Sequence, residues 1–262
     1  MKFNMKLMAG SFFVVLIVCV CLAASYWQFS RLAQRKDLNA KIERSMAKPP
    51  FELNKSVELG DLEYRTVEMT GIFDGDRQVL VVGRFFEGEP GFNVLTPFVL
   101  DNGSAIIYVN RGWIPQPLGD SIIDGKSSAA DIEPFGGYDQ KRNVTGLIRR
   151  NEPKRVVGNS HFNDKTSISP RIATDTFIEL FDKEQAKKVA DFWVQEDFQS
   201  IDGKKIAKSS PEKEIFPKQI EKPKLDERNH LSYAIQWLCF AIIAIITWVV
   251  ILRKSKKVRE AV

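Results

Sequence analysis

Two long apolar segments stand out in the pattern of hydrophobic and polar positions along the chain. Residues 7–30 and residues 229–252 each run for 24 positions without an Asp, Glu, Lys or Arg. As helices they would be about 36 Å long, enough to cross a hydrocarbon core of about 30 Å. We therefore predict a membrane protein with one transmembrane helix in each segment.

The first apolar segment has an alternative interpretation as a cleaved signal peptide. Two lysines precede it, and Ala23-Ala24-Ser25 offers a small-residue cleavage site. Its apolar run is longer than the core of such signals, which is about 7 to 15 residues, so a retained helix is favoured. The run begins within the first seven residues, and no Arg- and Ser-rich presequence precedes it. This favours a bacterial inner membrane over an organelle.

Residues 31–228 have the pattern of a small β domain. Helical spacing continues from the first apolar segment to Ala47, and Pro49-Pro50 ends it. Short alternating or apolar runs then predict strands, and Asp101-Asn102-Gly103 predicts a hairpin turn between two of them. The predicted strands are residues 64–73, 78–86, 91–100, 104–114, 142–150 and 190–199.

The connections between these strands are less regular. Residues 117–142 gather Gly, Ser and Asp and predict a surface loop, and residues 203–226 form a Lys- and Pro-rich tether. Residues 177–191 predict one helix, whose candidates for the buried side are Ile178, Phe181 and Val189.

A short internal similarity links residues 69–72 with residues 144–147, since both segments contain Thr-Gly between apolar residues. It indicates either two equivalent edge strands or chance agreement over four positions.

The predicted fold class is a membrane protein with two transmembrane helices, N- and C-terminal, flanking a mainly antiparallel β extramembrane domain with one or two helices. A doubly wound α/β enzyme is disfavoured, because the strands follow one another through turns and no Gly-rich phosphate loop opens a helix.

The net charge of +5 lies in the flanks of the two spans. The flanks hold seven of the 38 basic residues and one of the 33 acidic residues, which leaves 31 basic and 32 acidic residues between the spans. This nearly neutral domain gives no support for nucleic-acid binding, so no nucleic-acid partner is expected. The basic tail at residues 253–262 instead predicts a cytoplasmic anchor that contacts membrane lipids.

Two spans place both termini on the same side of the membrane. Basic residues lie on both sides of each span, so a simple count nearly balances. The positive-inside rule discounts long translocated segments, and residues 31–228 are such a segment. We therefore expect both termini in the cytoplasm and the β domain on the outer side.

Catalytic motifs are absent from the sequence. It contains no G-x-S-x-G, H-E-x-x-H or P-loop motif, and its three cysteines all lie within the apolar segments. A thiolate metal site in the β domain is therefore not expected. An enzyme that uses carboxylates of the β domain is a disfavoured alternative. His161, in a polar segment, is interpreted as a solvated loop residue rather than a site residue.

His230 lies at the start of the second span. On a helix, Tyr233, Ala234 and Trp237 share its face and form an aromatic, apolar wall. A neutral imidazole here is a candidate ligand for haem iron, with the propionates reaching Arg228 or Arg31. The alternative is an ordinary aromatic belt at the membrane interface, to which Tyr26 and Trp27 would also belong.

The segment from Asn110 to Pro115, NRGWIP, is the most distinctive part of the β domain. Arg111 and Trp113 could stack on another surface. The structural alternative, which we favour, is that Arg111 pairs with an internal carboxylate and Trp113 fills the core.

An ordered set of short motifs resembles the Surfeit locus 1 family. Any one motif is weak, but their order between two terminal spans is specific. The motifs are Trp27-Gln28 with Arg31, Tyr64-Arg65 with Val67, Gly71-Ile72-Phe73, Gly91-Phe92, Thr96-Pro97-Phe98, Val109 to Pro115, Thr145-Gly146, and Asn229-His230-Leu231 with Tyr233 and Trp237. Tyr26 before the first motif and Arg35-Lys36 after it depart from the family pattern.

The resemblance implies an assembly factor for cytochrome c oxidase that binds haem a and assists its insertion into the main oxidase subunit. The implied iron ligand is His230, with Tyr233, Trp237 and Arg228 around the cofactor. Haem a synthase is a second candidate partner, and the implied location of the β domain is periplasmic. Within the family, the alternative is a scaffold that stabilises an oxidase intermediate without holding haem.

Overall fold

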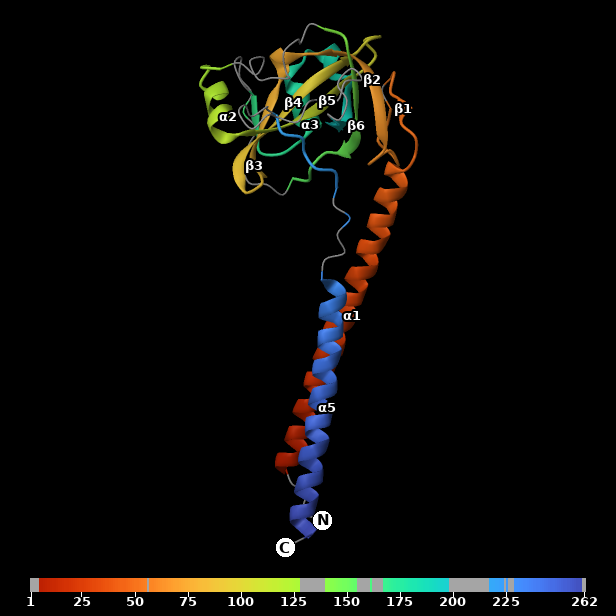
Figure 1. Cartoon of the computed structure of the whole chain (residues 1–262), viewed down its shortest axis with the longest axis vertical. Coiled ribbons are helices and arrows are strands. Elements are labelled where there is room, and N and C mark those ends of the chain that lie inside the picture. Colours follow the sequence, from red (N-terminus) through yellow and green to blue (C-terminus); the bar gives the residue numbers. More distant parts are fainter. Residues whose placement is uncertain are drawn as a thin grey trace, which may run out of the picture. The chain divides into compact units, whose positions relative to one another are not determined.

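The computed structural model describes residues 5–55, 57–127, 140–154, 161, 167–197, 217–223, 225 and 229–260. The chain divides into two units (Figure 1). One contains residues 1–41 and 223–262, and the other contains residues 42–222. The predicted fold class is confirmed, since long apolar helices at the two ends of the chain flank a β domain with short helices.

The first unit consists of α1 (Met5–Met46) and α5 (His230–Glu260). Both are long and apolar enough to cross a membrane, over Leu7–Met46 and His230–Lys256. The predicted continuation of the first helix is confirmed, because α1 runs on to Met46, just before Pro49-Pro50.

The two helices pack through small residues. Ser25 Oγ donates a hydrogen bond to the backbone oxygen of Ala234 at 2.9 Å, and Ala234 is fully buried. Farther along the pair, Trp248 Nε1 donates to Ser11 Oγ at 3.1 Å. Small residues let helix backbones approach closely, which is how transmembrane helices associate without a hydrophobic driving force. The pairs 25 with 234 and 11 with 248 make the helices antiparallel.

The second unit is built on one eight-stranded sheet. In spatial order its strands are β1-β2-β6-β8-β5-β4-β3-β7, and an extra pairing joins β2 to β4. That pairing closes β2, β6, β8, β5 and β4 into a barrel. The strands are β1 (Phe51–Glu52), β2 (Thr66–Phe73), β3 (Val79–Phe86), β4 (Glu89–Leu100), β5 (Ile106–Pro115), β6 (Arg142–Arg150), β7 (Ser167–Ser169) and β8 (Val189–Glu196).

Most strand pairs are antiparallel, as the sequence predicts. The exceptions are β1 with β2, β3 with β7, and β5 with β8. Alternate residues of the barrel strands point inward and form the main core, for example Val67 and Met69 of β2, Ile107 and Val109 of β5, and Phe192 and Val194 of β8.

The two Thr-Gly segments pair with each other in this barrel, so the interpretation as edge strands is wrong. Met69 lies opposite Val144 in the antiparallel pair of β2 and β6. A Cβ on Gly71 would lie 2.1 Å from the backbone oxygen of Val99 in β4, and one on Gly146 would lie 2.4 Å from that of Gln195 in β8. The glycines therefore let the neighbouring backbones approach closely.

The predicted loop at 117–142 is wrong in its first part. Helix α2 (Gln116–Ile123) begins there, with Pro117 in its first turn. Ile122 packs in a small core with Phe92, and Gly119 lies directly against the Phe92 ring. This tertiary contact, rather than the local composition, determines the helix. Residues 128–139 lie outside the described residues.

The predicted single helix at 177–191 is also wrong. Three short elements replace it, α3 (Thr174–Phe177), η3 (Ile178–Leu180) and α4 (Lys183–Ala186). Phe181 has an extended backbone, and the Asp182 carboxylate accepts from two backbone N–H groups to begin α4, which breaks the helix. Phe181 packs on a core cluster as predicted, whereas Ile178 is 38% exposed. Val189 begins β8.

Candidate functional site

His230 is the first residue of α5, and its half-buried imidazole faces α1. Its Nδ1 lies 2.8 Å from Gln28 Oε1. Because a carbonyl oxygen can only accept, this geometry suits the tautomer in which Nδ1–H is the donor. The proton on Nδ1 leaves Nε2 with a free lone pair, the tautomer that binds a metal through Nε2.

Gln28 orients this imidazole in the way that an outer-shell partner orients a ligating histidine. Such a partner fixes both the tautomer and the ring direction, and it raises the basicity of the coordinating nitrogen. One helical turn away, the hydrogen bond from Ser25 to Ala234 fixes how the two helices are aligned along each other. The pairing of residue 28 with residue 230 is therefore built into the helix packing.

Aromatic residues lie close in sequence to His230 on α5 and to Gln28 on α1. Tyr233 is 52% exposed, and Trp237 is half-buried, with its ring edge-to-face on Phe240 at 5.9 Å. On α1, Trp27 is exposed, and the guanidinium of Arg31 lies 5.5 Å from its ring centroid. Ala234, predicted to be part of the wall, is instead buried against α1. Arg228 lies outside the described residues.

The ligands available near His230 limit the kind of metal site that it could form. Among the described residues, no group of three or more His, Cys, Asp or Glu side chains could hold a bare ion. A macrocycle that brings four nitrogen ligands of its own needs only one from the protein. His230 offers one imidazole, which could serve as the single protein ligand of an iron porphyrin.

The β domain contains a buried pair of ionisable side chains, Arg111 and Glu196. Arg111 Nε lies 3.8 Å from Glu196 Oε2, and the guanidinium lies 4.3 Å from the Phe73 ring centroid. Burial raises the pKa of Glu196 to about 7, although the positive charges of Arg111 and Arg142 act in the opposite direction. Trp113 is buried and stacks on Phe86. The structural interpretation of the NRGWIP segment is therefore confirmed.

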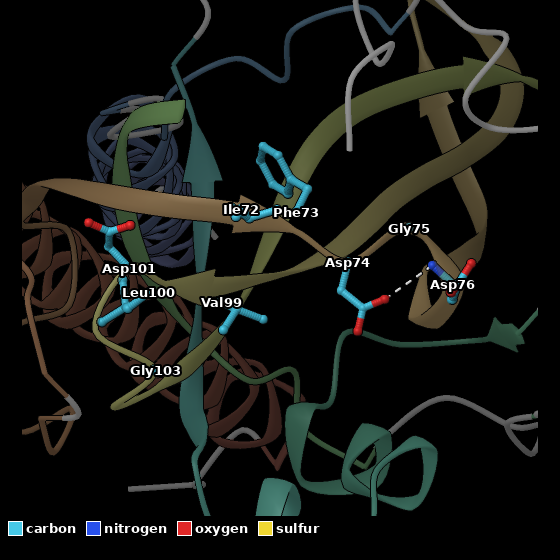
Figure 2. Close-up of a pocket in the computed structure, with 9 residues that line it drawn as sticks. All are labelled: Ile72, Phe73, Asp74, Gly75, Asp76, Val99, Leu100, Asp101 and Gly103. Atoms are coloured by element: carbon cyan, nitrogen blue, oxygen red, sulfur yellow. Dashed lines mark hydrogen bonds between the residues drawn. The ribbon is translucent and has the colours of Figure 1, made fainter. Parts of the chain in front are cut away.

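A pocket of about 510 Å³ opens where β2 and β4 pair (Figure 2). Three aspartates line it, but Asp74 forms an ion pair with Arg77 at 2.6 Å, and Asp101 is paired with Lys141. Asp74 also accepts from the backbone N–H of Asp76. No histidine, cysteine or serine lines the pocket, so its lining offers no nucleophile and base pair.

His161, interpreted as a solvated loop residue, is exposed and forms a backbone bridge with Ile168. Of the two histidines, only His230 is therefore joined to a side-chain partner by a hydrogen bond in the described part of the chain.

Comparison with known proteins covers both the helices and the barrel. The SURF1 family pattern matches residues 14–242. The chain belongs to the SURF1 family. The match includes Gln28 and His230, and the resemblance predicted from the sequence motifs is confirmed.

Several SURF1 relatives align over most of their length. A SURF1-like protein of Monosiga brevicollis is 26% identical over 241 residues, covering 87% of this chain and 82% of the relative. The cytochrome oxidase assembly protein SHY1 of Saccharomyces cerevisiae is 23% identical over 306 residues, covering 98% of this chain and 78% of the relative. A SURF1-like protein of Rickettsia bellii is 23% identical, covering 87% of this chain and 84% of the relative. The SURF1 family is not an enzyme family, which further disfavours the enzyme alternative.

Gln28 is the site residue that sequence reasoning missed. It forms part of the Trp27-Gln28 motif, yet no local pattern links it to a histidine 202 positions away. Antiparallel packing of two spans of equal length would predict this contact, because it brings the end of one span beside the start of the other.

Proposed function

We propose that this chain is an assembly factor for cytochrome c oxidase, which holds haem a on His230 and assists its insertion into the main oxidase subunit. The observation that carries the proposal is the hydrogen bond from His230 Nδ1 to Gln28 Oε1 at 2.8 Å, which leaves Nε2 free to coordinate iron. Family membership and the assembly role named for the yeast relative support the oxidase as the target.

Each residue of the site has a separate task in this proposal. His230 is the iron ligand and Gln28 holds its ring. Tyr233 and Trp237 give the macrocycle an apolar surface, and the guanidiniums of Arg31 and Arg228 are the candidates to pair with its propionates. Haem a, when bound, supplies an iron centre that accepts one imidazole nitrogen. A single protein ligand on a partly exposed site also favours release to the oxidase.

We assign the protein to the cell inner membrane with two spans, the barrel in the periplasm and both termini in the cytoplasm. The charge-rich residues after the second apolar segment, including Arg253, Lys254 and Lys256, then meet anionic lipids on the cytoplasmic side. This orientation places the beginning of α5, and with it His230, at the periplasmic surface. Haem a synthase, which would supply the cofactor, is the second partner we propose.

The proposal is tested by the visible absorption spectrum of the full-length protein, purified in detergent from cells that make haem a. We expect a Soret band in the parent protein, its loss in His230→Ala, and its retention in the control His161→Ala, which removes the other histidine. A colourless parent protein that still co-purifies with the main oxidase subunit would contradict haem binding and support the scaffold alternative.

A further inference from the structure

The segment just before the second span, residues 217–222, is bound to the barrel. We call it the strap. Lys218 forms an antiparallel bridge with Trp113 of β5, in which each backbone N–H donates to the oxygen of the other residue, at 2.8 and 2.9 Å. The strap therefore adds a short antiparallel partner at the end of β5.

Side chains at the end of β8 also hold the strap. Gln195 is buried, and its Nε2 donates to the backbone oxygens of Ile220 and Glu221 at 2.8 and 3.1 Å. The Asp197 carboxylate accepts from Gln219 Nε2 at 3.0 Å and forms an ion pair with Lys222 at 2.9 Å. Adjacent ends of β5 and β8 thus bind five consecutive residues, 218–222.

Gly112 is required where the strap crosses β5. Its φ is +120°, a region that residues with a side chain rarely adopt. A Cβ at this position would lie 2.6 Å from the Lys218 oxygen and 2.8 Å from the Pro217 Cβ. Any side chain at residue 112 would push the strap away. This explains the glycine between Arg111 and Trp113, which neither the barrel core nor the proposed haem site uses.

The strap shortens the chain that joins the barrel to the second span. Asp197, the last described residue after β8, precedes His230 by 33 residues, whereas Lys222 precedes it by eight. At about 3.5 Å per residue, 33 residues allow Asp197 and His230 to lie up to about 115 Å apart. The eight residues after Lys222 allow His230 to lie only about 28 Å from the bound strap. α1 is the other covalent connection between the helices and the barrel.

We propose that Gly112, Gln195 and Asp197 form a clamp for the strap, and that this clamp limits how far His230 can lie from the barrel. The three are positioning residues, because none of them touches the imidazole. The clamp rests on the proposed function only in the use made of His230, since its geometry requires no haem. Under the proposed function, the clamp shortens the connection between the barrel and the end of α5 that would hold haem.

Two variants loosen the clamp in different ways, and each alters a different strand. Gly112→Ala adds the Cβ that collides with the strap. Gln195→Glu keeps the oxygen that accepts from Arg149 Nη1 but loses the amide hydrogens donated to the strap. The control is Gly88→Ala, because Gly88 has φ +91° and no atom lies within 4 Å of the position that its Cβ would take, so it imposes backbone strain without a collision.

Two measurements on the full-length protein in nanodiscs test the clamp. Hydrogen exchange reports the Lys218 amide, which we expect to exchange at least about tenfold faster in both variants and unchanged in the control. Double electron–electron resonance reports the distance between spin labels at Glu184 and Leu231 in a cysteine-free background. We expect its distribution to broaden toward longer distances in both variants, because release of the strap lengthens the flexible connection between the barrel and α5.

The outcomes separate this inference from the haem proposal, because neither measurement involves haem. Faster exchange with an unchanged distance distribution would show that α1 alone positions α5, and it would overturn the clamp. Unchanged exchange in Gln195→Glu would overturn it as well, even if Gly112→Ala fails to fold. A colourless protein whose distances respond as expected would retain the clamp and reject only the haem ligand.

Discussion

Replacing Glu196 with glutamine should make the protein more stable at neutral and higher pH. Glu196 is 8% exposed, and its Oε2 lies 3.8 Å from Arg111 Nε, too far for a hydrogen bond. Burial raises the pKa of this carboxyl from 4.5 to about 7 in the folded protein. The native state therefore favours the neutral acid, which glutamine imitates in shape and polarity.

The sign and size of the effect follow from proton linkage. Between about pH 4.5 and pH 7 the folded protein binds a proton at Glu196 that the unfolded chain has released. The stability that this proton gives is fully present below about pH 4.5 and is lost as the pH rises through about 7. A rise in the pKa from 4.5 to about 7 corresponds to about 3 kcal/mol. The stability of Glu196→Gln minus that of the parent should therefore rise by about 3 kcal/mol from about pH 4.5 to about pH 8.

Urea unfolding of the full-length protein in detergent measures this difference. Tryptophan fluorescence is a suitable probe, because Trp113 and Trp193 are buried in the barrel domain. Other titrating groups cancel when variant and parent are compared at each pH. The control is Glu184→Gln, at an 82% exposed carboxylate whose ion pair with Lys187 lies on the surface, where such pairs contribute little to stability. A difference that stays constant with pH, or one that falls as the pH rises, would refute the reasoning and show that the ion pair with Arg111 outweighs burial.

Three further predictions concern the barrel and the helix pair. Gly71→Ala should destabilise the barrel by about 3 kcal/mol or more in the same urea assay, because its Cβ would lie 2.1 Å from the Val99 oxygen; a change below about 1 kcal/mol would contradict a closed barrel. Gln28→Leu should weaken haem binding by His230 about 10- to 100-fold in a titration followed by absorbance, whereas Gln28→Glu, which keeps an acceptor, should bind nearly as well. Ser25→Leu should separate the helices and lower the yield of haem-loaded protein; a normal yield would argue against this packing.

The parts of the fold that depend on local pattern could be predicted from the sequence. The two charge-free segments became α1 and α5, and alternating residues such as Val67 and Met69 became barrel strands. The hairpin turn at Asp101 to Gly103 joins β4 and β5 as expected.

The parts that depend on distant partners could not be predicted. Closure of the barrel requires β2 to pair with both β6 and β4, and only the close approach of Val99 to Gly71 reveals it. Helix α2 exists because Gly119 and Ile122 meet Phe92, which no local composition shows.

The candidate site divides in the same way. His230 stands out because an ionisable group at the start of a span is unusual, and this is visible in the sequence. Gln28 does not stand out, because its role arises when antiparallel helices pack with Ser25 beside Ala234. The glycine of the NRGWIP segment could be assigned to a turn, but the strap that passes over it, at Lys218, is far from it in the chain.

The central claim, that Nε2 of His230 is the iron ligand, is tested most directly by chemical rescue. His230→Gly removes the imidazole and leaves a space beside Gln28 that free imidazole can enter. We predict that the variant, produced in cells that make haem a, lacks the Soret band of the parent, and that adding imidazole with haem a restores it. A variant that shows the full Soret band without imidazole would contradict the claim, because iron would then be held by another residue.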